Sequence, residues 1–178
     1  ATQTNVKALE NSISWGRWAT LMDKAPTLDL KKQEDAQAKL IAASPYYAVF
    51  QSKSSEWKVP VVGGMGFALK GGEAIVIDER LNAVSSANLE NGKLQIDFAS
   101  ASFTTGFDLV TKGERIAMQA QGVIAPDGQL FGNGQYSHPT NMAVSGVVTA
   151  EKGGSASYIF QRRLEDARQI HGITYWGK

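Results

Sequence analysis

Histidine is the residue type of this chain best suited to acid–base or ligand chemistry, because imidazole titrates near neutral pH and binds metals. The chain has two histidines. One of them, His138, lies with Tyr136 in the polar segment 135–141, between two predicted strands. Binding residues concentrate in such loops, and histidine and tyrosine are both axial ligands of haem iron. Tyr136 and His138 are therefore the candidate binding residues, with haem as the cofactor they would suit; the alternative is an exposed turn histidine before Pro139.

Catalytic chemistry has less support in the sequence. His171 lies in a predicted strand beside Gly172, and without a partner constellation it is interpreted as a hydrogen-bonded structural histidine. The chain has no Gly-x-Ser-x-Gly elbow, no His-Glu-x-x-His pair and no Walker-type phosphate loop. The paired carboxylates Asp78-Glu79 and Glu165-Asp166 stand next to arginines, which predicts exposed ion pairs. The sequence thus predicts a protein that is not an enzyme, and an enzyme of unknown class is kept as an alternative.

Composition narrows the range of partners. The 18 basic and 17 acidic residues leave a formal charge of +1, which provides no field to gather nucleic acid. The absence of cysteine excludes disulfides and thiolate metal sites. No stretch approaches the roughly 18 consecutive apolar residues of a membrane helix, so we expect no transmembrane segment.

The spacing of the glycines along the chain indicates many short strands. The chain has 18 glycines and 5 prolines, spread between alternating segments as in proteins built of strands and turns. Predicted strands cover residues 12–18, 46–52, 57–69, 74–78, 93–99, 102–111, 115–124, 129–136, 142–150, 155–162 and 169–176. They outnumber the roughly eight strands of a small filled barrel, so some are expected to be halves of one strand or to lie outside the barrel.

Local patterns give the orientation of one strand and the position of three turns. Polar and apolar residues alternate over residues 93–98, which predicts that Leu94, Ile96 and Phe98 face the core. Asn91-Gly92 tolerates positive φ angles and predicts a hairpin tip near Asn91. Pro126-Asp127-Gly128 and Gly153-Gly154 predict two more hairpins, so the C-terminal half is expected to be an antiparallel meander.

One segment has the composition of a helix. Residues 29–43 contain Lys, Gln, Glu, Ala and Leu without glycine or proline. Asp29 or Thr27 can cap the first N–H groups, and Pro45 stops continuation. The apolar stripe is narrow, which predicts a helix on the barrel surface or across an open end.

Glycine-interrupted aromatic segments stand at both ends of the chain, at residues 13–18 and 170–176. Pairing them would close a barrel and remove the exposed sheet edges. The sequence therefore predicts an all-β fold, a single antiparallel barrel of about eight strands over residues 1–178, lipocalin-like, with one inserted helix. Trp15 and Trp18 are three positions apart, so they are expected to face opposite sides of their strand.

Several of these segments, taken together, resemble a known family. Residues 15–18, 91–98, 143–148, 158–160 and 170–173 look like the C-terminal β-barrel region of bacterial FecR-domain exported proteins. That region is similar to the small barrels of transferrin-binding protein B and of hemophilin-type haem-binding proteins. Residues 147–152 replace the glycine- and asparagine-rich segment usual in the transferrin-binding lipoproteins. The FecR regulatory half is missing, so the resemblance implies no iron-signalling activity.

The resemblance implies an extracytoplasmic location in a Gram-negative bacterium: periplasmic, outer-membrane-associated or secreted. The expected function is a non-catalytic binding or assembly module that holds a protein partner or small ligand with loops at one barrel mouth. Residues 135–141 and 19–45 supply the candidate loops. A haem or small-molecule carrier using the loop of Tyr136 and His138 is the alternative.

Overall fold

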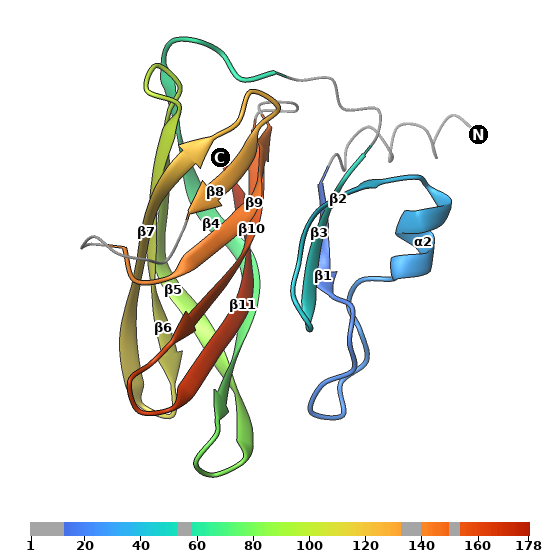
Figure 1. Ribbon diagram of the computed structural model, residues 1–178, viewed down its shortest axis with the longest axis vertical. Helices are drawn as coiled ribbons and strands as arrows, with labels where there is room; N and C mark the ends of the chain where they lie inside the picture. The colour runs from blue at the N-terminus through green and yellow to red at the C-terminus, as the bar shows by residue number, and fades with distance from the viewer. Residues whose placement is uncertain (1–12, 53–57, 133–139, 150–153) are drawn as a thin grey trace.

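A closed barrel of eight antiparallel strands forms most of the molecule (Figure 1). The structure is a computed structural model that describes residues 13–52, 58–132, 140–149 and 154–178. The barrel strands are β4 (Gly64–Asp78), β5 (Ala83–Asp97), β6 (Ser102–Thr111), β7 (Glu114–Ile124), β8 (Gln129–Gly132), β9 (Ala143–Thr149), β10 (Ser155–Arg163) and β11 (Arg168–Gly177). Consecutive strands pair as neighbours from β4 to β11, which confirms the predicted meander of the C-terminal half.

The first and last strands of the barrel are paired, as the fold prediction required. β11 pairs with β4 along its length and with β10 on its other side. The partner that we expected for β11, the aromatic segment 13–18, does not pair with it. Both hydrogen-bonding edges of β11 are already occupied, so segment 13–18 can pack only against its outer face.

Two long strands replace several of the short predicted ones. β4 joins the predicted segments 57–69 and 74–78 into one strand, which begins at Gly64. The hairpin tip expected near Asn91 is wrong, because β5 continues through it to Asp97. Asn91 has a φ of 54°, and the register with β6 shifts between Glu90 and Lys93, so Asn91-Gly92 forms a bulge within β5.

Apolar side chains fill the interior of the barrel. Leu94, Ile96 and Phe98 are at most 5% exposed, as their alternation predicted. Other members of this core include Phe103, Phe107, Leu109, Met118, Leu130, Tyr158, Phe160, Ile170 and Trp176. The hydroxyl groups of Tyr158 and Thr105 hydrogen-bond inside the barrel at 2.7 Å. An eight-stranded barrel is narrow enough for side chains to fill, and this one has a packed interior.

A small sheet lies against the outside of the barrel. It has the order β1-β3-β2, formed by β1 (Ile13–Arg17), β2 (Lys39–Ala43) and β3 (Tyr47–Gln51). The predicted helix over 29–43 is present only as α2 (Leu30–Asp35), capped by the Asp29 side chain. Gln37 adopts a φ of 56° and the chain then enters β2. Residues 39–43 pair with β3 because pairing and burial outweigh their helix propensity.

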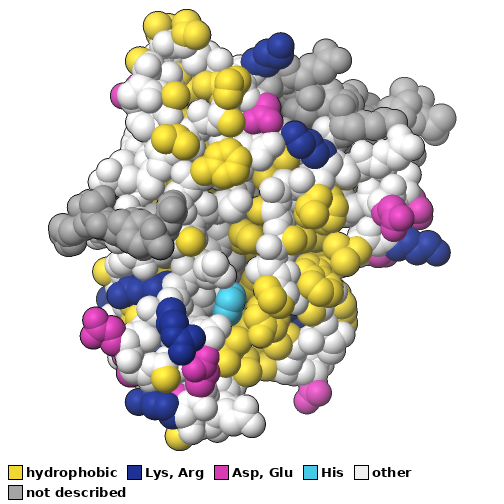
Figure 2. Space-filling view, in the orientation of Figure 1, with side chains coloured by type: hydrophobic (Ala, Val, Ile, Leu, Met, Phe, Trp, Pro, Cys, Tyr) yellow, Lys and Arg dark blue, Asp and Glu magenta, His cyan; other side chains and the backbone are white. Residues whose placement is uncertain are grey.

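Aromatic and aliphatic side chains join the small sheet to β9, β10 and β11. Tyr47 and Val49 from β3 pack with Val147 and Ile173 on the outer face of the barrel. Trp15 stacks on Tyr175 with ring centroids 5.4 Å apart. Figure 2 shows apolar side chains gathered where the sheet and barrel meet.

Trp15 and Trp18 lie on opposite faces of the small sheet, as their spacing predicted. Trp15 faces the barrel. Trp18 packs with Leu28 and Phe50 on the other face, and its Nε1 donates to the Ser44 carbonyl at 2.9 Å.

Candidate functional site

The two residues that the sequence singled out for binding, Tyr136 and His138, lie outside the described residues. Their role, and haem ligation with it, stays a prediction. The described residues on either side of this segment, Gly132 and Thr140, locate its two ends. The segment leaves the end of β8 and returns beside β7, before β9 begins.

The returning end is fixed to the edge of β7 by side-chain hydrogen bonds. The Gln119 N–H donates to Asn141 Oδ1 at 2.8 Å, and Asn141 Nδ2 donates to the Ala117 carbonyl at 2.9 Å. The Gln121 N–H donates to Thr140 Oγ1 at 3.1 Å. β8 pairs with β7 only at Val123 and Ile124. The side chains of Thr140 and Asn141 therefore hydrogen-bond to backbone groups of β7 that β8 leaves unpaired.

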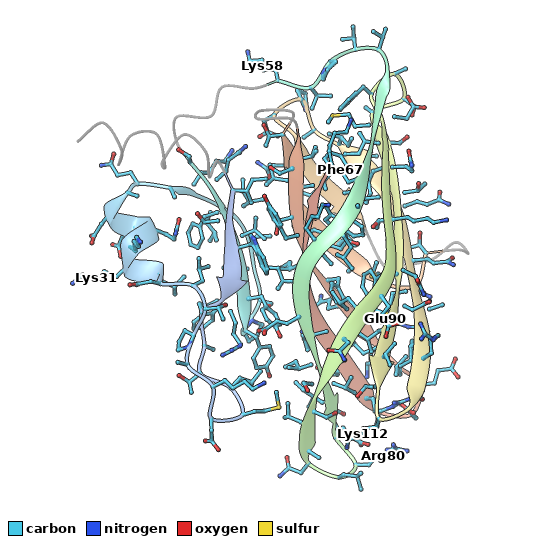
Figure 3. The ribbon with its side chains drawn as sticks, turned by 180° about the vertical axis from the view of Figure 1, so that it is seen from behind. Lys31, Lys58, Phe67, Arg80, Glu90 and Lys112 are labelled. Atoms are coloured by element: carbon cyan, nitrogen blue, oxygen red, sulfur yellow. The ribbon has the colours of Figure 1, made fainter. Side chains whose placement is uncertain are left out.

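A groove edged by polar side chains adjoins this point on the outer wall formed by β5, β6 and β7. Its volume is about 490 Å³. Figure 3 views the molecule from behind, with Glu90 labelled on β5 at this wall. The outward-facing side chains that line the groove are Asn91, Lys93, Gln95, Thr104, Asp108, Ala117, Gln119 and Gln121.

The hollow arises where side chains are missing or small. Across the three strands, Lys93 pairs with Gly106 and Gly106 with Gln119, so the middle of this row has no side chain. A Cβ added to Gly106 would lie 3.1 Å from the Met118 carbonyl oxygen. Ala117 is the small residue opposite Asp108 in the next row.

Amide and hydroxyl side chains line the upper end of the groove, and ion-paired side chains line its lower end. Gln95, Thr104 and Gln121 form a cross-strand row that offers both donors and acceptors. At the other end, Asp108 accepts from Asn91 Nδ2 at 2.9 Å and from Arg115 Nη1 at 3.1 Å. These two contacts hold the pKa of Asp108 below its usual range. The groove therefore suits a ligand bound by hydrogen bonds, with one fixed carboxylate at its lower edge.

Sequence reasoning missed the groove, although part of its signal was visible. Polar residues alternate with apolar ones in the predicted strands 93–99, 102–111 and 115–124, which indicates a solvated face. Which of these polar residues stand side by side depends on the register between strands. The bulge at Asn91 changes that register and is not distinguishable from a hairpin turn in the sequence.

The junction between the small sheet and the barrel contains a second cluster of titratable groups. Arg17 is 4% exposed; its Nε donates to Glu73 Oε1 at 2.8 Å, and its Nη1 donates to the Ala19 and Lys24 carbonyls. Burial, and then the Glu73 carboxylate, raises the pKa of Tyr47. The contacts of Arg17 are all within the chain, so this cluster fastens the small sheet to β4.

His171 belongs to the same junction and has a structural role, as the sequence predicted. Its Nε2 lies 3.2 Å from Gln169 Oε1, and its ring packs against Tyr46 with centroids 5.3 Å apart. Burial lowers the pKa of His171. The neutral imidazole is therefore the form that this environment favours.

Two absences among the described residues bear on the site. Within residues 13–52, 58–132, 140–149 and 154–178, no three His, Cys, Asp or Glu side chains are grouped to hold a metal ion. In the same part of the chain, no helix has the length and apolar character to cross a membrane.

Comparison with known proteins shows the fold. No protein-family model matches this chain, and no curated protein sequence does. Crystal structures of the vaccine antigen transferrin binding protein B from Haemophilus parasuis Hp5 are similar to it. A single-mutant structure aligns with a TM-score of 0.51 at 13% identity, covering 74% of this chain and 30% of that one. A double-mutant structure gives 0.49 at 13% identity, covering 74% and 29%.

The chain thus spans less than a third of the length of the structures it matches. At this identity the likeness concerns the fold alone. The barrel resembles that of transferrin binding protein B, as the sequence suggested, whereas the resemblance to FecR-domain exported proteins stays a prediction.

Proposed function

We propose that this chain is a non-catalytic binding module that holds its partner on the outer wall of the barrel. The observation that supports this most directly is the contrast between the two sides of that wall. The interior is filled by apolar side chains, whereas the outer face of β5, β6 and β7 carries an open groove edged by amide, hydroxyl and charged side chains. A ligand therefore finds hydrogen-bonding groups on the outer face of the barrel.

The small sheet lies on a different part of the barrel wall and does not cover the groove. The sheet contacts β9, β10 and β11, and the groove lies on β5, β6 and β7. The candidate loop 135–141 joins the groove through Thr140 and Asn141, which bond to groove strand β7. Loop and groove together form the binding surface of this proposal, and Tyr136 and His138 are its proposed loop contacts.

The chemistry of the groove favours binding over catalysis. Asp108 is already engaged by Asn91 and Arg115, and the groove residues otherwise include amides, a hydroxyl group and Lys93. General acid–base catalysis needs titratable groups that converge on one reacting atom. The amide row instead resembles a recognition surface, in which many weak hydrogen bonds give specificity.

An extracytoplasmic location in a Gram-negative bacterium, in the envelope or secreted, completes the proposal. The barrel fold is shared with transferrin binding protein B from Haemophilus parasuis, a protein named for binding another protein. The absence of cysteine suits an oxidising compartment, where unpaired thiols would risk mispairing.

The test fills the groove without disturbing the core. Ala117 is exposed and outward-facing, so Ala117→Trp places an indole in the hollow. Ser86→Trp is the matched control, because Ser86 is exposed on β5 and does not line the groove. The chain and both variants are immobilised and exposed to Gram-negative envelope extract and to serum, and retained species are quantified by mass spectrometry.

We expect a species held by the original chain and by Ser86→Trp that Ala117→Trp retains at least about tenfold less, the loss expected when an interface centre is blocked. Calorimetry with that purified species then measures the affinity directly. Near-UV circular dichroism checks that Ala117→Trp is folded. Equal retention by all three proteins would contradict binding at the groove.

A further inference from the structure

One end of the barrel is covered by a short loop that the chain holds firmly in place. The Val59 N–H donates to the Pro126 carbonyl at 3.1 Å, and the Phe98 N–H donates to the Gly63 carbonyl at 2.8 Å. The Val59 side chain packs against the barrel core. The residues between these two anchors, Pro60 to Val62, therefore cannot fold back into the interior.

This loop presents two neighbouring valines to solvent. Val61 is 83% exposed and Val62 is 71% exposed. The loop lies at the upper extreme of the long axis of the molecule (Figure 1), and Figure 2 shows apolar side chains at that extreme. The two adjacent valines form a small apolar projection at the tip of the molecule, on a loop that is anchored on both sides.

The acidic and basic side chains near this tip differ in the contacts they make. Asp97 accepts from the Ala99 and Ser100 N–H groups, and Asp127 pairs with Lys39. Lys58 precedes the loop at this end (Figure 3), and Lys178 follows the end of β11. Neither lysine forms an ion pair with any residue that the structure describes. Among the described residues at this end, two lysines without an ion pair therefore stand against one carboxylate without a cationic partner, that of Asp97.

We infer that the Val61-Val62 tip docks onto an anionic phospholipid bilayer. The two valines stand clear of their own molecule, so a protein partner would need a matching pocket, whereas acyl chains adapt to a projecting group. Aliphatic side chains gain free energy in the membrane interface, and nearby lysines are attracted to anionic headgroups. The inference is independent of the groove and of the proposed function.

The opposite end of the barrel supplies a matched control. Leu81 is also 71% exposed, but it stands in the turn between β4 and β5 among engaged charges. Asp78 pairs with Arg80, and Glu79 with Arg163. Leu81 thus matches Val62 in exposure and differs in the free positive charge nearby.

The chain has no cysteine, so a single introduced thiol can be labelled uniquely. Val61→Cys and Leu81→Cys each receive the polarity-sensitive fluorophore NBD and are mixed with vesicles of phosphatidylethanolamine and phosphatidylglycerol. We expect the emission at position 61 to rise about threefold and shift to the blue, and position 81 to remain unchanged. Vesicles of phosphatidylcholine alone should give a smaller change at position 61.

Vesicle flotation tests the same inference without a label. The Val61→Asp, Val62→Asp double variant should lose at least about fivefold in the bound fraction, and Leu81→Asp should bind like the original chain. Absence of binding to anionic vesicles, or equal responses at positions 61 and 81, would overturn the inference. Concentration-dependent self-association that the double variant abolishes, with no vesicle binding, would assign the tip to a second copy of the chain instead.

Discussion

Arg17 joins three parts of the chain at the junction between the small sheet and the barrel. It lies in β1, pairs with Glu73 of β4, and donates to the Ala19 and Lys24 carbonyls of the loop that follows β1. Its side chain is 5% exposed and that of Glu73 is 39% exposed. Partial exposure of Glu73 weakens the ion pair, but Arg17 also holds the Ala19 carbonyl and shares the Lys24 carbonyl with the Leu21 N–H.

Replacing Arg17 should therefore cost more than replacing an exposed arginine. We expect Arg17→Met to lower the free energy of unfolding by about 2 kcal/mol, because it leaves Glu73 and the Ala19 carbonyl without the Arg17 donor, while the Lys24 carbonyl keeps the Leu21 N–H. Urea unfolding followed by circular dichroism measures this loss. Arg80→Met is the control, since the Arg80 side chain is 55% exposed beside Asp78, and it should leave stability nearly unchanged. Equal effects of the two substitutions would contradict the role given to Arg17.

His171 makes stability depend on pH. Burial lowers its pKa in the folded chain, whereas the unfolded chain titrates with the ordinary histidine pKa of about 6.5. Below that value the unfolded state binds the proton more readily, so stability falls as the pH is lowered and is fully present above it. The groups that face His171 are the Tyr46 ring and Gln169, and neither supplies a negative charge to stabilise imidazolium.

The corresponding experiment compares the two histidines of the chain. Urea unfolding at about pH 7.5 and about pH 5.5 should show a smaller pH-dependent loss in His171→Gln than in the original chain. His138→Gln serves as the control and should keep the original pH dependence. A loss of pH dependence in His138→Gln alone would assign it to the other histidine.

At the scale of elements, the Asn141 side chain makes hydrogen bonds to β7 that a longer β8 would make with its backbone. β8 has four residues, and it leaves the edge of β7 near Ala117 and Gln119 to the Asn141 side chain. Asn141→Ala should destabilise the fold by about 1–2 kcal/mol, because the Gln119 N–H loses its acceptor and the Ala117 carbonyl keeps only its contact with Arg162. Amide hydrogen exchange should accelerate at Gln119 and remain slow at Ile170, which lies in the fully paired β11. Uniform acceleration across the barrel would contradict a local role for Asn141.

Strand identity could be predicted where local pattern and tertiary packing agree. Leu94, Ile96 and Phe98 alternate with polar residues and are buried as expected. Residues 39–43 show the opposite case, because their helix-forming composition is overridden by pairing with β3. Local propensity contributes less free energy than a paired strand packed on a barrel gains.

Features that depend on the pairing register between strands could not be predicted from the sequence. Asn91-Gly92 has the same local signal in a hairpin tip and in a bulge, and only the pairing of β5 with both β4 and β6 decides between them. The groove has the same origin, because Gly106 leaves a hollow only when Lys93 and Gln119 stand on either side of it. The two aromatic ends resemble each other, but β4 and β10 occupy the edges of β11 that β1 would need.

At the scale of the whole molecule, the small sheet and the barrel share a continuous apolar interface. Ile173 is fully buried on the outer face of β11, against Tyr47 and Val49 of β3. The inner face of the sheet and this part of the barrel wall bury each other. The prediction that residues 1–178 form a single domain therefore requires the two parts to unfold together.

In the original chain, urea transitions followed by far-UV and by near-UV circular dichroism should coincide. Ile173→Asp places a carboxylate inside the interface and should cost at least about 3 kcal/mol, because the new charge is desolvated and stands opposite Glu73, whose carboxylate already engages Arg17. Near-UV circular dichroism reports both the Trp15–Tyr175 stack of the junction and the Tyr158–Trp176 stack of the barrel, so part of the near-UV signal of Ile173→Asp should be lost at lower urea than the far-UV transition of the barrel. Val84→Asp is the control, since Val84 is 41% exposed on β5, and its two transitions should stay coincident. Separate transitions in the original chain would instead show that the sheet and barrel are independent units.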